Sequence, residues 1–366
     1  MKNCENCGVS SRDDSLFCGN CGHPFPEKVI VKVEEAETEP ASIYTKFVDF
    51  LNTYIGNDKK AELNWKTLFT DVFNRHSRED AENIFIVGTK NTTPTMEEVS
   101  QQWPRPWLYS RVFFLFLMSF LLLYICCAVF GNINAVPGLI VVGSFTVPLS
   151  GLVMFLELNA YKNISIFEIA RIFLLGGCAS LVVTLTLFSI VGVSELNFIG
   201  AIIVGVVEEV GKLVIIYYFF QRIDKKNILT GLLIGASVGA GFAAFESAGY
   251  AMNFLLNYGW STMMDTIFLR AFLAPGGHIA WAAITGAALS IVAGNNSTLE
   301  ISDLKEPDFL RLFLIPVILH AIWDSPIANF ASDIFLVYIL LTVIVWVVVL
   351  IMINMGLSEI RKIKTM

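Results

Sequence analysis

The segment FIGAIIVGVVEEVGKLVIIYYFF, from Phe198 to Phe220, is long enough to cross a lipid bilayer and carries three charged residues near its middle. A membrane-spanning helix needs about 20 predominantly apolar residues. An acidic or basic residue at its centre costs roughly 2.5 to 3.5 kcal/mol on insertion. Glu208, Glu209 and Lys212 are therefore expected to have a function inside the membrane.

Three later apolar segments also carry ionisable residues: Glu246, then His278, then His320 with Asp324. His278 follows Ala274-Pro275-Gly276-Gly277, which cannot continue a regular helix. A broken helix at membrane depth is tolerated where it is buried in protein or lines a wet cavity. Helical rise places Glu208 about 15 Å below the outer end of its segment. We expect these side chains to share a water-filled pocket that opens to the outside.

The composition of the chain indicates a membrane protein with a soluble appendage. Of its 366 residues 55% are hydrophobic and only 16% are charged, whereas a soluble protein has about 25% charged residues. The expected fold class is an all-α polytopic membrane protein with about eight transmembrane helices. We place them near 112–130, 136–156, 168–192, 198–220, 228–256, 266–294, 309–330 and 333–356.

The basic residues near the ends of these segments predict the orientation of the chain. With the N-terminus inside, the inner segments carry Arg105, Arg111, Lys162, Arg171, Arg222, Lys225, Lys226, Lys305, Arg311, Arg361, Lys362 and Lys364. Only Arg270 lies near an outer end. Because basic residues accumulate in cytoplasmic loops, we expect a cell-membrane protein with both termini in the cytosol.

The N-terminus predicts a small metal-binding unit. Residues 1–26 contain two Cys-x-x-Cys pairs, formed by Cys4, Cys7, Cys18 and Cys21. Four thiolates at this spacing bind structural zinc in a zinc ribbon, and so short a segment hardly folds without the metal. Thiolates that load zinc need a reducing compartment, which agrees with a cytosolic N-terminus.

Between the ribbon and the first span the sequence predicts soluble structure. Residues 27–41 are an acidic linker, and residues 42–110 form a partly helical soluble and juxtamembrane segment. His76 stands in a charged run, NRHSRED, and is expected on a solvated face.

Spacing within the apolar segments adds geometry to the predicted site. Glu208 and Lys212 are four residues apart on one helical face, where an ion pair can form, and His320 and Asp324 have the same relation. Glu208 and Glu209 point about 100° apart. One of them is expected to face the pocket, while the other meets Lys212 or a neighbouring helix.

Four motifs in order resemble those of the PrsW intramembrane proteases, distant relatives of the CAAX-processing proteases. EEVGK at 208–212 resembles EExxK, FAAFE at 242–246 resembles FxxxE, HIAWAAITG at 278–286 resembles the third motif, and HAIWD at 320–324 resembles HxxxD. The resemblance implies a transmembrane protease domain, which we place at 111–358. It also implies cleavage of a membrane-anchored substrate near the outer face. The role known in the family is a first cut in an anti-sigma factor, which starts stress signalling.

The resemblance leaves two mechanisms open. In one, His278, His320 and one or two of Glu208, Glu209 and Glu246 bind zinc, and the remaining glutamate is the general base. Asp324 then orients His320. In the other, Glu208 or Glu209 activates water without a metal, and histidine stabilises the oxyanion. Lys212 has a supporting role in both.

Two other classes of function fit the same residues. Chains of acids and histidines relay protons in transporters and proton-coupled channels. A non-catalytic membrane sensor would use the zinc ribbon to bind a cytosolic partner. The bilayer and a membrane-anchored protein are the expected partners of the protease, and no direct nucleic-acid binding is expected because the chain has no basic patch.

Overall fold

The structure is a computed structural model that describes residues 2–11, 18, 20–21, 23, 42–57, 59–192, 195–223, 226–294, 299–329 and 336–365. The predicted acidic linker at 27–41 and Lys225 lie outside these residues. The chain divides into two compact units, residues 1–45 and 46–366.

The first unit contains the four N-terminal cysteines. Strands β1 (Lys2–Asn3) and β2 (Ser10–Ser11) pair antiparallel and bring the first Cys-x-x-Cys pair into a tight turn. The Sγ atoms of Cys4 and Cys21 are 3.6 Å apart, and those of Cys7 and Cys18 are 3.5 Å apart. All four lie within 4.8 Å of one another. Sulfur atoms at about 2.3 Å from a tetrahedral zinc ion are about 3.8 Å apart, so the cluster fits the predicted zinc ribbon.

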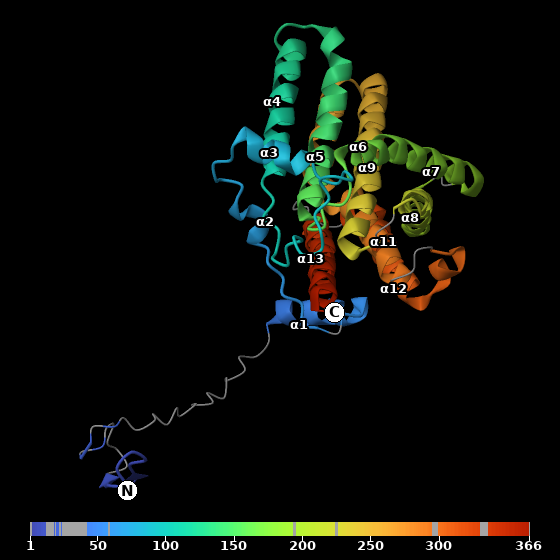
Figure 1. The fold of residues 1–366 in the computed structure, drawn as a ribbon. Helices are drawn as coiled ribbons and strands as arrows, with labels where there is room; N and C mark the ends of the chain where they lie inside the picture. Colours follow the sequence, from blue (N-terminus) through green and yellow to red (C-terminus); the bar gives the residue numbers. More distant parts are fainter. Residues whose placement is uncertain are drawn as a thin grey trace. The chain divides into compact units, whose positions relative to one another are not determined.

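The second unit is helical (Figure 1). Its helices are α1 (Ile43–Ile55, which begins at the unit boundary), α2 (Thr67–Thr70), α3 (Arg78–Phe85), α4 (Leu108–Ala128), α5 (Val136–Leu158), α6 (Ile166–Arg171), α7 (Gly177–Val191), α8 (Phe198–Phe220), α9 (Ile228–Tyr258), α10 (Trp260–Leu273), α11 (His278–Ala293), α12 (Pro307–Asp324) and α13 (Leu336–Thr365). A π-helical turn, η2 (Ile172–Gly176), joins α6 to α7. The turn η3 (Ala274–Gly276) separates α10 from α11, as the Pro-Gly-Gly sequence predicts.

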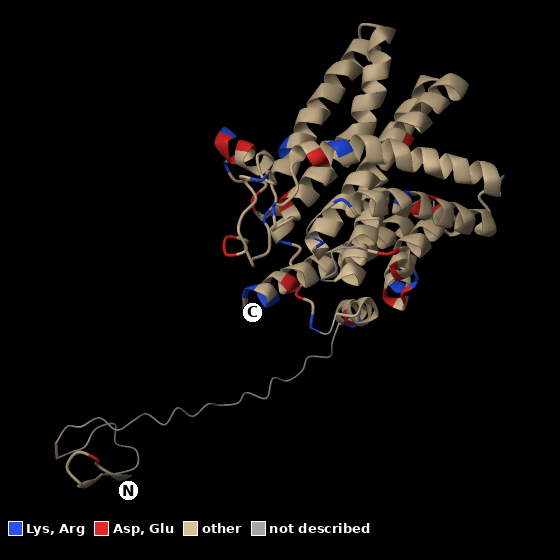
Figure 2. Cartoon of the chain, turned by 45° about the vertical axis from the view of Figure 1, so that its right-hand side comes forward, with Lys and Arg blue, Asp and Glu red and all other residues tan. Residues whose placement is uncertain are grey.

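Six helical stretches of the described chain are long and apolar enough to cross a membrane: Leu108–Ala128, Ile133–Leu158, Ile166–Val191, Ile228–Tyr258, Trp260–Ala293 and Leu336–Thr365. The prediction of an all-α polytopic membrane protein is confirmed. The other two predicted spans are the helices α8 and α12, each with three charged residues. That both cross the membrane stays a prediction. In Figure 2 the outer part of the α4–α5 hairpin, at the top, is free of charged residues, and the charged residues are spread over the middle and lower parts of the view.

Helices α9 and α11 form the centre of the bundle. Almost every residue in the first half of α9, and nearly all of α11, is buried. Their close approach depends on glycine: a Cβ atom on Gly235 would overlap the backbone of Ala282, and one on Gly239 would overlap the carbonyl oxygen of His278. Small residues allow membrane helices to approach in this way. This contact fixes where α11 begins relative to α9, and therefore where His278 lies.

The segment before the first span packs on the same bundle. The Glu157 carboxylate at the end of α5 accepts the backbone N–H groups of Trp107, Leu108 and Tyr109 at 2.8, 2.9 and 3.0 Å. These N–H groups at the start of α4 have no acceptor within the helix itself. The prediction for His76 is wrong, because its ring stacks on Trp107 with the ring centroids 3.7 Å apart. The indole ring provided a partner that the charged run did not reveal.

Candidate active site

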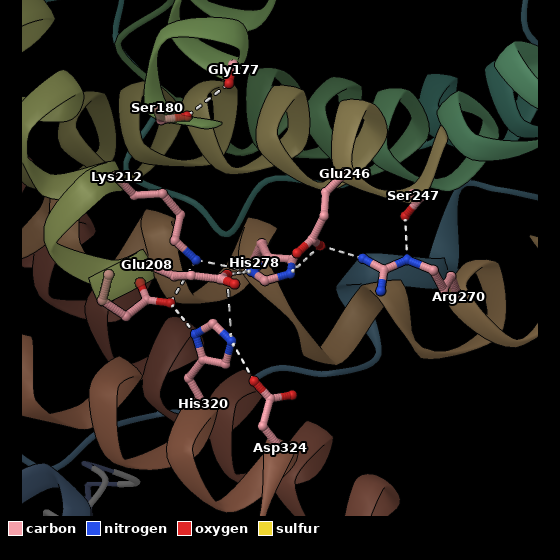
Figure 3. A network of polar contacts seen from close by, with 11 residues as sticks. Gly177, Ser180, Glu208, Lys212, Glu246, Ser247, Arg270, His278, His320 and Asp324 are labelled. Atoms are coloured by element: carbon pink, nitrogen blue, oxygen red, sulfur yellow. Dashed lines mark hydrogen bonds and ion pairs between the residues drawn. The ribbon is translucent and has the colours of Figure 1, made fainter. Parts of the chain in front are cut away.

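The predicted site residues gather at one cavity of about 600 Å³. Its lining includes Glu208 of α8, Glu246 of α9, His278 of α11, and His320 and Asp324 of α12. Glu209 and Lys212 are fully buried behind this lining. Residues from four helices, separated by more than 100 positions in the sequence, thus meet in one network (Figure 3).

His320 is held from behind by a buried carboxylate. Its Nδ1 atom lies 2.8 Å from Oε1 of Glu209, and the same oxygen accepts from Nζ of Lys212 at 2.6 Å. Because Lys212 supplies the positive charge, Glu209 is an ionised acceptor, and Nδ1 of His320 carries the donated proton. In the neutral imidazole the lone pair is then on Nε2, which faces the cavity.

His278 has a similar arrangement with the ring reversed. Its Nε2 atom lies 3.0 Å from Oε2 of Glu246, and its Nδ1 atom is 2.9 Å from Nζ of Lys212. An ammonium group can only donate, so Nδ1 is the acceptor and Nε2–H donates to Glu246. Each histidine therefore has a carboxylate on one nitrogen and a lone pair on the other.

The two lone-pair nitrogens converge on Glu208. Its Oε2 atom lies 3.6 Å from Nε2 of His320 and 3.9 Å from Nδ1 of His278, and within the described chain it is buried with no hydrogen-bond partner. Oδ2 of Asp324 is 3.3 Å from the same Nε2 atom. With a neutral His320, acceptor atoms of two carboxylates and of the imidazole therefore face one another here, and a bound cation would balance them.

The donor set fits a divalent cation. Ligand atoms of Glu208, His278 and His320 all lie within 4.8 Å of one another. Nitrogen and oxygen ligands at about 2.0–2.1 Å from a tetrahedral ion are about 3.3 Å apart, so the 3.6 and 3.9 Å separations of the two histidine nitrogens from Glu208 are slightly longer than a bound ion would give. Two histidines and one glutamate with an open fourth position form a common catalytic zinc set.

The structure assigns the adjacent glutamates to different places. Glu208 faces the cavity, whereas Glu209 binds Lys212 and His320. Of the two glutamates that the spacing puts within reach of Lys212, the one that pairs with it is Glu209, three residues away, and Glu208 is the one that faces the cavity. Helix α8 packs against α12, and His320 of α12 contacts the same Glu209 oxygen that Lys212 binds.

Asp324 lies beside His320, as the four-residue spacing predicts. The nitrogen that it approaches is Nε2, on the cavity side. Nδ1, the nitrogen on the far side, is held by Glu209. Asp324 is partly exposed in the cavity, and Figure 3 shows its second oxygen directed away from the histidine.

Aromatic rings hold both imidazoles. Trp281 stacks on His320 with centroids 4.3 Å apart and meets His278 edge-on at 5.1 Å. Phe242 lies 5.0 Å from the His278 ring, with Nζ of Lys212 over its face at 4.7 Å. The FxxxE spacing thus places a ring and a carboxylate, one helical turn apart, on the same imidazole.

The network includes one charged residue, Arg270, that was not predicted from the sequence to be part of the site. Arg270 of α10 lines the cavity, forms an ion pair with Glu246, and donates from Nε to Oγ of Ser247 at 2.8 Å. Its guanidinium also lies over the Tyr250 ring at 4.6 Å. The available signal was a single arginine in an otherwise apolar outer segment, eight residues before His278.

The fold and this donor set define a class: polytopic helical membrane proteins with a histidine–glutamate hydrolytic centre buried among their helices. The family model described as PrsW family intramembrane metalloprotease matches residues 167–353. The chain belongs to this family, so it is a membrane-embedded peptidase. No curated protein and no solved structure matches the chain.

Proposed function

We propose that this protein cleaves a membrane-anchored protein substrate in the described cavity, with Glu208, His278 and His320 holding the catalytic metal ion. The family supports a metal-dependent peptidase. The observation that carries the residue assignment is the convergence of His278 Nδ1 and His320 Nε2 on the unpartnered Glu208 oxygen, at 3.9 and 3.6 Å. The identity of the ion follows from the ligand types, which suit zinc.

The protein groups around this point have separate tasks. Glu209 keeps the proton of His320 on Nδ1, and Glu246 keeps the proton of His278 on Nε2, so both cavity-facing lone pairs stay available. When bound, a divalent cation polarises the scissile carbonyl and makes water acidic enough to act as the nucleophile near neutral pH. Binding would use the His278 lone pair that Lys212 occupies, and Lys212 would keep its ion pair with Glu209.

Asp324 is our candidate for moving the proton. Asp324 lies in the cavity beside His320. Unlike Glu208, it is not one of the three proposed metal ligands. Unlike Glu209, it does not bind the His320 nitrogen that faces away from the cavity. In the reaction it would accept a proton from the attacking water and deliver it to the leaving amine, the two transfers that peptide hydrolysis requires. This role differs from the orienting role that the spacing predicted.

The side of the membrane and the substrate are further parts of the proposal. The inner segments carry nearly all of the basic residues, which supports cytosolic termini and a cut near the outer face. An anti-sigma factor with a single span is the substrate class that the family resemblance supports. A first cut there would start a stress response.

Single substitutions in cells test the function. Glu208→Gln should abolish cleavage, and an uncut membrane protein should accumulate as in a strain lacking the gene. Glu168→Gln, which removes a surface ion pair with Arg171, is the matched control and should leave processing normal. Normal processing by Glu208→Gln would rule out the assigned site. A proton-coupled transporter would instead give changed ion flux with no accumulating protein.

A further inference from the structure

Both histidines of the site are held by the same series of side-chain contacts, in which a cationic side chain binds a carboxylate and the carboxylate binds the imidazole. On one side Lys212 binds Glu209, which binds His320. On the other Arg270 binds Glu246, which binds His278. The first series is fully buried, since Lys212 and Glu209 have no exposed side-chain surface. The second series reaches the cavity, and 28% of the Arg270 side chain is exposed.

From this geometry we propose that Arg270 is a positioning residue for the metal centre. It holds the Glu246 carboxylate aimed at Nε2 of His278, so that Nδ1 of His278 is on the side of Glu208. The inference rests on the proposed function of the cavity. It adds a residue that belongs to none of the four motifs and comes from a helix, α10, that provides no ligand.

The contacts of Arg270 fix the orientation of its guanidinium group. Three groups fix its guanidinium: the Glu246 carboxylate, the Ser247 hydroxyl at 2.8 Å and the Tyr250 ring at 4.6 Å. All three belong to α9, within a single helical turn or so. A planar guanidinium with several donors in fixed directions suits this arrangement better than a lysine ammonium.

The position of Arg270 in the chain explains why such a support is needed. His278 is the first residue of α11, directly after the η3 break. A first-turn residue lacks the preceding helical turn that would otherwise confine its side chain. Arg270 ties α10, on the far side of the break, to the α9 carboxylate that His278 binds. The two helices flanking the break are thereby coupled to one metal ligand.

A substrate-binding role is the alternative, because Arg270 lines the cavity. The two roles predict different behaviour in a double-mutant cycle with Glu246. A support acting through Glu246 has no further effect once Glu246 is changed to Gln, whereas a direct substrate contact keeps its own effect.

The experiment measures metal affinity at the membrane site of the full-length chain by chelator competition, alongside kcat and KM. Arg270→Met should lower metal affinity by about 10- to 100-fold, the usual loss when a partner of a metal-binding histidine is removed. Arg270→Lys, which keeps the charge beside Glu246, should recover much of this loss. Glu246→Gln should match Arg270→Met, and the double variant should be no worse than Glu246→Gln alone.

Arg311→Met is the matched control, because Arg311 also has one carboxylate partner, at 3.0 Å, and a similar side-chain exposure of 34%. It should leave metal affinity unchanged. Unchanged affinity in Arg270→Met with a raised KM, or multiplying losses in the double variant, would overturn the positioning role. The variant His320→Ala distinguishes failure of the proposed metal site from failure of the Arg270 role. If His320→Ala also keeps its metal, the proposed site is wrong, and not only the role of Arg270.

Discussion

Replacing Glu209 with Gln should destabilise the protein strongly, because it removes the counter-charge of a fully buried lysine. The Nζ atom of Lys212 lies 2.6 Å from Oε1 of Glu209, and neither side chain is exposed. Two unit charges at this distance attract by about 6 kcal/mol at an effective dielectric constant of 20. Since the amide dipole of Gln retains part of this attraction, the expected loss is about 3 to 5 kcal/mol of the free energy of unfolding, the range for breaking one partner of a buried pair.

The assay is denaturant unfolding of the purified full-length chain in detergent micelles. Glu82→Gln is the matched control, because Arg78 and Glu82 are also 2.6 Å apart but both side chains are mostly exposed. That variant should unfold like the wild type. The double variant Glu209→Gln with Lys212→Met should be more stable than either single variant, because no buried charge is then left alone. Equal behaviour of Glu209→Gln and Glu82→Gln would refute the reasoning.

Two further predictions concern the scaffold of the site. Gly239→Val should push α9 away from the carbonyl of His278 and abolish both cleavage and metal binding at the membrane site; Gly249→Val, on the same helix with open space around it, should retain both. Glu157→Gln should weaken the start of α4 by about 1.5 to 3 kcal/mol, the value for a hydrogen bond to a charged group, measured as faster hydrogen exchange at the amide of Leu108. Wild-type exchange there would contradict the capping role.

The functional residues could be predicted from the sequence because the apolar interior of a membrane is a poor solvent for charged groups. Charge in hydrocarbon is costly, so Glu208, Glu246 and Asp324 stand out in apolar segments without any knowledge of the fold. The break before His278 is equally visible, because proline and glycine interrupt helices in any context. The same charges explain why α8 and α12 fall outside the six stretches that length and apolar composition identify.

The assignment of partners could not be predicted, because it depends on how the helices rotate and pack. Spacing allows Lys212 to reach Glu208 or Glu209 equally well, and the position of His320 on α12 decides between them. Arg270 belongs to no motif, and its role is visible only when α10 and α9 lie side by side (Figure 3). The stacking of His76 on Trp107 joins residues 31 positions apart in the sequence.

The number of metal ions bound per full-length chain is the decisive measurement for the proposed membrane site. We expect two ions in the purified wild type, one in the ribbon and one at the membrane site. Replacing the ribbon cysteines Cys18 and Cys21 with Ser should leave one ion and retain cleavage of the membrane substrate. Adding His320→Ala should remove the second ion and abolish cleavage. A cysteine variant that cleaves its substrate while containing no metal would contradict the account.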